Sequence, residues 1–283
     1  MDTLRTTKEF QLVILMVAML SADVEFHDSG SGPAILFVPG SFGTGGSWRG
    51  VIERLGGRYR VITTSLLGYG ATRDIRPAGH PDMLLQVQVL DQICDHIDAP
   101  VHVVGHSYGA LAVLAHAVQG RRKAKSLSLV EATPFGLLKI AGDHHHSMMF
   151  EQLIERYFAA YRTGDRQAAR HVIDFFEGAG TFDAFPAKFR AYIEATTATN
   201  IADWTSYAPS ALPLNALRSI SIPISVIRGG VANPAMGQLA ERLAEALPAA
   251  RLSTIEAGRH FLPTTHAAEI APIIADTVAR GET

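Results

Sequence analysis

Residues 101–118 read VHVVGHSYGALAVLAHAV, and this stretch decides the fold. Its first four residues, VHVV, favour a strand, whereas its last nine residues favour a helix. Between them lies GHSYG at 105–109, a G-x-S-x-G pattern whose glycines let the backbone turn sharply close to its neighbours. The pattern predicts that Ser107 is a nucleophile, exposed at the carboxyl end of a sheet strand and at the positive end of a helix dipole.

Apolar strands alternate with helices on both sides of this turn. The predicted strands are AILFVPG at 34–40, RYRVITT at 58–64, KSLSLV at 125–130, IPISVIRGG at 222–230 and ARLSTI at 250–255. The predicted helices include MLLQVQVLDQICDHI at 83–97, QLAERLAEAL at 238–247 and AAEIAPIIADTVAR at 267–280. This alternation predicts an α/β fold, a mostly parallel sheet with helices on both faces.

One long segment breaks the alternation. Between Phe135 and Ser219 there is no convincing strand, and most of the segment has the spacing of amphipathic helices. A structureless loop of this length would be improbable in a compact domain. We therefore expect residues 135–219 to form a helical insertion that divides a core made of residues 22–134 and 220–283.

Composition excludes several classes of protein. The chain has 283 residues, of which 47% are hydrophobic and 18% charged, so disorder over most of its length is excluded. The net charge of −2 makes nucleic acid an unsuitable partner. Cys94 is the single cysteine, which leaves no internal disulfide and no cysteine-based zinc site. His144, His145 and His146 are consecutive and would not converge on one ion. We expect a small-molecule substrate, no metal and no cofactor, and the oligomeric state stays open.

The amino-terminal residues 1–21 stand outside this pattern. Residues 11–20 read QLVILMVAML, an apolar run too short to span a bilayer as a helix, which needs ~20 residues. The run resembles the apolar part of a signal peptide, but Met16 and Met19 also allow a later start of translation. We expect an extension of the fold and a cytoplasmic protein without stable membrane insertion, with export as the alternative.

A serine nucleophile needs a base, and His260 is the best-placed histidine for this role. It follows the last predicted strand in a short loop before the final helix. His266 is the nearest rival, but it lies at the start of that helix. His106 adjoins the serine and is expected to point away from it and support the turn.

These motifs together resemble the α/β-hydrolase superfamily. The resemblance runs from about Ala22 to the end of the chain. It is carried by GHSYG at 105–109, VPGSFGTGGSW at 38–48, LLGYGAT at 66–72 and GRHFLPTTH at 258–266. It implies that residues 135–219 are the helical cap that the family inserts between its sixth and seventh strands. Aromatic residues of the cap would then line the substrate pocket, with Trp204 and Tyr207 as candidates. Phe42, from the loop at 38–48, is a further candidate for the pocket lining.

The resemblance also implies an oxyanion hole made of backbone amides. One donor would be the amide of Tyr108, and the other that of Ser41, with Phe42 as the alternative. The family usually has histidine where this chain has Pro39, but the hole depends on N–H groups and not on that side chain.

The third member of the triad departs from the family's usual pattern. Many relatives have an aspartate after the seventh strand, and this chain has Asn233 there. An amide cannot stabilise an imidazolium by charge, and an Asp-to-Asn change in a serine triad costs ~10⁴ in turnover. Glu131, at the end of the sixth strand, is the predicted replacement. Asn233 as a neutral third member and some other acid remain as alternatives.

The predicted function is hydrolysis of a small hydrophobic ester, thioester or lactone by a Ser-His-acid triad through an acyl-enzyme. Carbon–carbon bond hydrolysis and cofactor-free perhydrolysis use the same residues and are alternatives. A small-molecule-binding protein that has kept the fold without turnover is a further alternative, because Asn233 stands at the acid's usual place.

Overall fold

The computed structural model describes residues 24–77, 81–207 and 212–283. The apolar run at 11–20 and the predicted extension 1–21 lie outside the described residues. Among the helices of the described ranges, none combines the length and the apolar character needed to cross a membrane.

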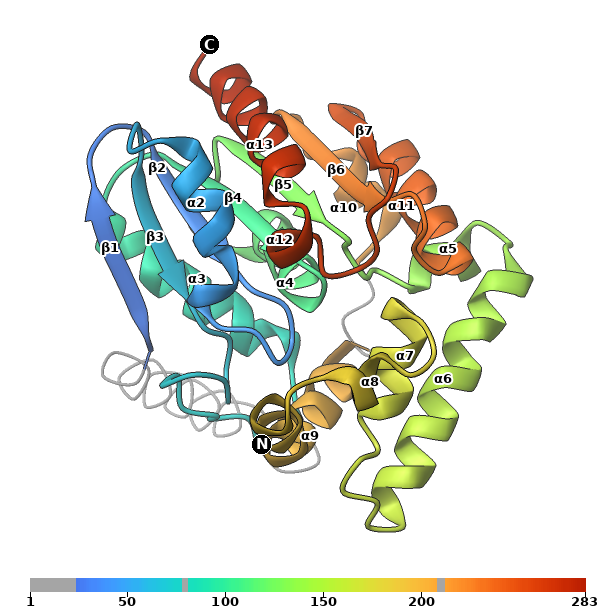
Figure 1. The fold of residues 1–283 in the computed structure, drawn as a ribbon. Helices are drawn as coiled ribbons and strands as arrows, with labels where there is room; N and C mark the ends of the chain where they lie inside the picture. Colours follow the sequence, from blue (N-terminus) through green and yellow to red (C-terminus); the bar gives the residue numbers. More distant parts are fainter. Residues whose placement is uncertain (1–23, 78–80, 208–211) are drawn as a thin grey trace, which may run out of the picture.

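A seven-stranded sheet forms the centre of the molecule (Figure 1). Its strands are β1 (Phe26–Gly30), β2 (Ala34–Val38), β3 (Arg60–Thr64), β4 (Val101–His106), β5 (Ser126–Val130), β6 (Ile224–Gly229) and β7 (Ala250–Ile255). Their order is β1-β3-β2-β4-β5-β6-β7, and every neighbouring pair is parallel except β1 with β3. The central strands β2, β4 and β5 are buried along their whole length, and the continuous apolar sequence of β2 is typical of a strand covered on both faces.

Helices cover both faces of the sheet, which confirms the predicted α/β fold. On one face lie α2 (Arg49–Leu55) and α13 (Ala267–Glu282), whose apolar side chains pack with Phe37 and Trp48 in one core cluster. On the other face, α3 (Met83–Ile97), α4 (Tyr108–Gln119) and α11 (Pro234–Ala246) belong to a second and larger cluster. Two short helices, η1 (Gly45–Trp48) and α12 (Leu262–Thr265), follow β2 and β7.

The described part of the segment between β5 and β6 consists of helices and the turns that connect them, and it contains no strand. It comprises α5 (Gly136–Ile140), α6 (His144–Arg162), α7 (Arg170–Glu177), α8 (Thr181–Ala184), α9 (Ala187–Tyr207) and α10 (Leu214–Arg218). Helices α6 to α9 lie together at one end of the sheet (Figure 1). The segment thus lies between the fifth and sixth of the seven described strands.

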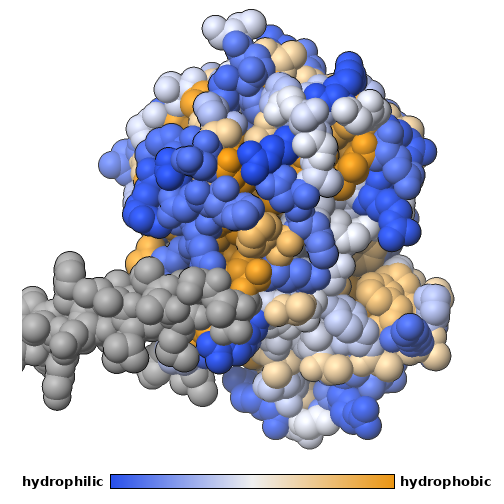
Figure 2. All heavy atoms as spheres, turned by 90° about the vertical axis from the view of Figure 1, so that its left-hand side faces the viewer, coloured by the Kyte–Doolittle hydropathy of each residue, from blue (hydrophilic) through white to orange (hydrophobic). Residues whose placement is uncertain are grey.

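The face of the molecule beside β1 is mainly hydrophilic. Figure 2 shows this face, and hydrophilic side chains cover most of the area that the grey atoms leave visible. Hydrophobic side chains reach the surface there in separate small areas, and single exposed apolar side chains are normal on a folded protein.

Candidate active site

Ser107 occupies the sharp turn between β4 and α4. Its backbone has φ 53° and ψ −124°, a conformation that residues with a side chain rarely adopt. The flanking glycines make the turn possible: a Cβ at Gly105 would lie 2.6 Å from Cα of Ala110, and one at Gly109 would meet the carbonyl of Pro39. Backbone strain of this kind persists where the surrounding structure enforces it, often at active sites.

His260 brings an imidazole to Ser107. It lies in the loop between β7 and α12, and its Nε2 is 2.9 Å from Oγ of Ser107, 153 positions earlier in the chain. Its other ring nitrogen, Nδ1, is 3.0 Å from Oε2 of Glu131. In the neutral tautomer whose Nδ1–H donates to Glu131, Nε2 accepts from the Ser107 hydroxyl. Three predicted residues are thus joined by one chain of hydrogen bonds.

Glu131 follows β5 at the carboxyl edge of the sheet. It is buried, its φ is 49°, and its second oxygen, Oε1, accepts a hydrogen bond of 2.6 Å from the amide of Gly229 at the end of β6. Of the four described non-glycine residues with positive φ, three are Glu131, Ser107 and Phe42. Backbone strain is therefore concentrated around this site.

Burial sets the protonation of the Glu131–His260 pair. It raises the pKa of Glu131 to about 8, because the carboxylate loses its solvation. Burial also lowers the pKa of His260, because the imidazolium loses its solvation. Both shifts disfavour a net charge on the pair, so burial makes it harder to remove the titratable proton that separates the neutral pair from the form with a carboxylate and a neutral imidazole.

Asn233 and His266 are the alternatives to Glu131 and His260, and both make other hydrogen bonds. Asn233 caps helix α11 through Oδ1, which accepts from the amide of Ala235 at 3.0 Å, and its Nδ2 donates to the carbonyl of Phe175 in α7 at 3.2 Å. His266 is half-buried, and its Nδ1 lies 2.8 Å from Oγ1 of the neighbouring Thr265.

Several contacts that hold the His260 loop could not be predicted from the sequence. His106 is buried, and its Nε2–H donates to the carbonyl of His260 at 2.8 Å. It therefore supports the histidine loop as well as the serine turn. Two residues of α7 also contact the His260 loop. Phe176 stacks on the His260 ring with ring centroids 4.3 Å apart, and Glu177 accepts a hydrogen bond from the amide of Phe261 at 2.5 Å.

The residues expected to supply an oxyanion hole lie beside Ser107. Ser41 and Phe42 follow β2, Tyr108 begins α4, and all three line the same cavity as Ser107. Their side chains have other partners: Oγ of Ser41 donates to Oδ2 of Asp203 at 2.6 Å. The backbone N–H groups of Ser41 and Tyr108 therefore stay the candidate donors, with that of Phe42 as the alternative to Ser41.

Two adjoining cavities meet at this site. The inner one, of about 50 Å³, is lined by Ser107 and His260 and by all three predicted pocket residues, Phe42, Trp204 and Tyr207. The outer one, of about 540 Å³, is lined by aromatic residues of the helical insertion, Phe185, Phe189 and Tyr192. The cavities share the following lining residues: Ser41, Phe42, His106, Ile173 and Phe261.

The histidine triplet at 144–146 has a local role at the start of α6. Nδ1 of His146 lies 2.8 Å from Oδ2 of Asp143, and the Asp143 side chain also caps the helix by accepting from the amide of His146. Among the described residues, no group of three or more His, Cys, Asp or Glu is arranged to hold a metal ion.

Comparison with known proteins gives one consistent result. A model of the alpha/beta hydrolase family matches residues 35–273. A pimeloyl-(acyl-carrier protein) methyl ester esterase from Nitrosomonas europaea is 31% identical over 113 residues, which span 40% of this chain and only 42% of that esterase.

Solved structures show the same fold over nearly the whole chain. An alpha/beta hydrolase from Sphaerobacter thermophilus superposes with a TM-score of 0.69 at 24% identity, over 90% of this chain and 95% of that one. MenH from S. aureus superposes with a TM-score of 0.71 at 16% identity, over 93% and 100% of the two chains. Given a family model that matches residues 35–273, the protein belongs to the alpha/beta hydrolase family.

Proposed function

We propose that the protein is a serine hydrolase that cleaves a small hydrophobic ester, thioester or lactone through an acyl-enzyme. The observation that carries this proposal is the hydrogen-bonded chain from Ser107 Oγ through both ring nitrogens of His260 to the carboxylate of Glu131. A nucleophile, a base and a group that orients the base are the parts that acyl transfer requires.

The proposed reaction has two steps. His260 takes the proton of Ser107 as the serine oxygen attacks the carbonyl carbon, and it then passes that proton to the leaving group. Water then gives a proton to the same imidazole and attacks the carbonyl of the acyl-enzyme, and the imidazolium returns that proton to Oγ of Ser107 as the acid is released. Glu131 holds the tautomer with Nδ1–H and stabilises the imidazolium that forms in each step.

The amides of Ser41 and Tyr108 are the proposed donors to the oxyanion. Both belong to residues that line the inner cavity with Ser107, at the ends of β2 and β4. Loss of one such donor typically costs about 3 kcal/mol of transition-state stabilisation.

Cavity size supports a substrate with a small acyl group. The inner cavity of about 50 Å³ has room for a few non-hydrogen atoms next to Ser107, and its lining is mostly aromatic and aliphatic. The outer cavity of about 540 Å³ has room for the leaving-group part of the substrate. We also propose that residues 135–219 form a cap domain, because helices α7 and α9 of this segment line the inner cavity.

The test is a series of p-nitrophenyl esters with acyl chains from acetate upward, hydrolysed by the wild type and by S107A. We expect kcat/KM to be highest for the shortest acyl chains and to fall to the background level in S107A. Greatest activity on long chains would contradict the small acyl group, and hydrolysis that persists in S107A would contradict the nucleophile. Carbon–carbon bond hydrolysis is favoured if the wild type reacts with fluorophosphonate but cleaves no ester.

A further inference from the structure

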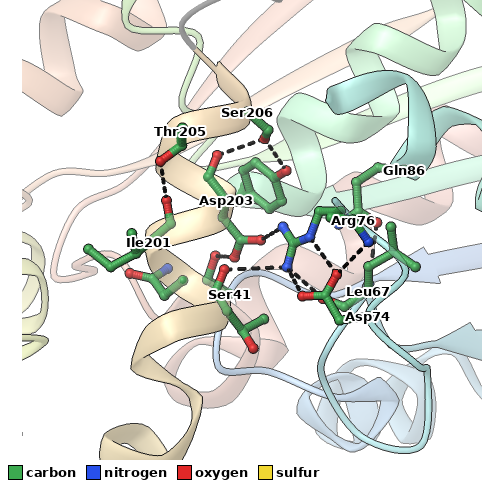
Figure 3. A network of polar contacts seen from close by, with 12 residues as sticks. Ser41, Leu67, Asp74, Arg76, Gln86, Ile201, Asp203, Thr205 and Ser206 are labelled. Atoms are coloured by element: carbon green, nitrogen blue, oxygen red, sulfur yellow. Dashed lines mark hydrogen bonds and ion pairs between the residues drawn. The ribbon is translucent and has the colours of Figure 1, made fainter. Parts of the chain in front are cut away.

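We propose that one turn of helix α9, Asp203 to Ser206, positions both oxyanion donors by holding the side chains of Ser41 and Tyr108. This inference rests on the proposed function. Asp203 and Ser206 are positioning residues in it, because they act through Ser41 and Tyr108 and not on the substrate. Figure 3 shows the polar network around this turn.

The first tether joins Ser41 to Asp203. Oγ of Ser41 donates to Oδ2 of Asp203 at 2.6 Å, across 162 positions of sequence. A hydroxyl group has one proton, so the side chain of Ser41 cannot also donate to a substrate oxyanion. This side-chain hydrogen bond fixes the position of Ser41 and does not involve its backbone N–H.

The second tether joins Tyr108 to Ser206 on the same turn. Oγ of Ser206 donates its proton to the carbonyl of Asp203 at 2.7 Å, and the Tyr108 hydroxyl lies 2.7 Å from the same Oγ. Tyr108 is therefore the donor in its contact with Ser206. Tyr108 and Ser206 are both buried, so water does not compete for these groups.

A buried ion pair with Arg76 holds Asp203 in place. Its Oδ1 accepts from Nη1 of Arg76 at 2.6 Å, and the side chains of both residues are 1% exposed. Arg76 is held in turn by the carboxylate of Asp74, 2.7 Å from its Nη2, and Tyr69 donates to Oδ2 of Asp203 at 2.7 Å. Figure 3 shows Arg76 between the two carboxylates.

This arrangement explains why a charged pair is buried between the insertion and the core. A buried carboxylate and guanidinium lose their hydration, and burial of such a pair is often no more stabilising than apolar packing. Both oxygens of Asp203 are occupied by protein donors, which makes it an unsuitable ligand for substrate. The contacts of Asp203 therefore have a positioning role. They help to hold Ser41, after β2, and Tyr108, after β4, against the same turn of helix α9.

Two single substitutions remove the tethers and leave both backbone amides in place. S41A removes the hydroxyl that contacts Asp203, and Y108F removes the hydroxyl that contacts Ser206. Y157F is the matched control, because the buried hydroxyl of Tyr157 donates to Oδ1 of Asn200 on the same helix at 2.9 Å, but Tyr157 supplies no oxyanion donor. The readouts are kcat and KM for p-nitrophenyl acetate, with the melting temperature of each variant.

We expect S41A and Y108F each to lower kcat by about tenfold or more, less than the roughly 10²–10³ lost when a donor itself is removed. KM should change little in both, because a misplaced oxyanion donor affects the transition state more than substrate binding. Y157F should lower the melting temperature about as much as Y108F and keep kcat within about twofold of the wild type, because it loses the same type of buried hydrogen bond.

The inference is wrong if kcat of S41A and Y108F stays as close to the wild type as kcat of Y157F, or if their losses appear in KM alone. A wild type that neither hydrolyses the ester nor reacts with fluorophosphonate would overturn the proposed function instead. The two failures are therefore distinguishable.

Discussion

The carboxylate of Glu131 lies 3.0 Å from Nδ1 of His260, although 129 positions separate the two residues in the chain. The contact forms at the carboxyl edge of the sheet, where the residue after β5 faces the loop after β7. Asn233, which follows β6, contacts α7 and caps α11. The proposed acid therefore lies one strand away from the family's more usual place.

Substitution of Glu131 and of Asn233, the two candidates for the third member of the triad, should have different effects. E131Q keeps the size of the side chain but removes the ionisable carboxyl group, and kcat/KM should fall by about 10³–10⁴, as in other serine triads that lose their acid. N233A should keep the chemistry within about threefold and lower stability by about 1 kcal/mol, because a helix cap is lost. Ester hydrolysis and thermal unfolding measured on both variants check this. Full activity in E131Q together with a large loss in N233A would contradict the assignment of Glu131.

The pH dependence of kcat/KM should follow from burial of the Glu131–His260 pair. Burial raises the pKa of Glu131 to about 8 and lowers that of His260, and both shifts favour the neutral pair, which holds one titratable proton. The form with a carboxylate and a neutral imidazole, which the base needs, appears as that proton leaves. Activity should therefore increase with pH, with a midpoint above the ordinary histidine value of about 6.5.

E131Q is the control for this pH profile. Without the carboxyl group, the residual activity should depend on His260 alone, whose pKa burial lowers. Its midpoint should therefore move below that of the wild type. Equal midpoints in the two proteins would show that another group controls the rate.

Backbone strain at Ser107 predicts a conflict between activity and stability. S107A and S107G both remove the nucleophile, but only glycine adopts φ 53° and ψ −124° without strain. We expect S107G to be more stable to unfolding than S107A by about 1 kcal/mol, and chemical denaturation of both variants measures this. An alanine variant as stable as the glycine variant would mean that the turn is not strained.

Much of this architecture was predictable because its signals are local. The strand, the glycine turn and the helix at 101–118 contain the information for the Ser107 turn, and the apolar strands determine the parallel sheet. His260 was also predictable, because the loop after the last strand lies at the same sheet edge as Ser107.

The contacts from the helical insertion were not predictable in the same way. Asp203, Arg76 and Glu177 are charged residues in segments with no motif, and their partners depend on how the insertion packs on the core. Sequence periodicity identifies helices such as α7 and α9 but does not specify which buried hydroxyl or amide each turn will meet.

The inner cavity should determine acyl chain length. Trp204 lines it and stacks on Phe135 with ring centroids 5.2 Å apart, so W204A should enlarge the space next to Ser107. We expect the preferred p-nitrophenyl ester to shift to longer acyl chains in W204A. F189A, in the outer cavity, should leave the order of acyl chains unchanged. The same shift in both variants would contradict the assignment of the acyl group to the inner cavity.

The most direct test of the proposed triad is the rate at which a fluorophosphonate labels the intact protein, followed by mass spectrometry of the labelled peptide. In the wild type the label should be found on Ser107 within minutes. H260A should label at least about 10³-fold more slowly, because the serine has lost its base, whereas H266A, a change in the neighbouring rival, should label like the wild type. Rapid labelling of Ser107 in H260A, or no labelling of the wild type, would contradict the claim that residues 107 and 260 act together as nucleophile and base.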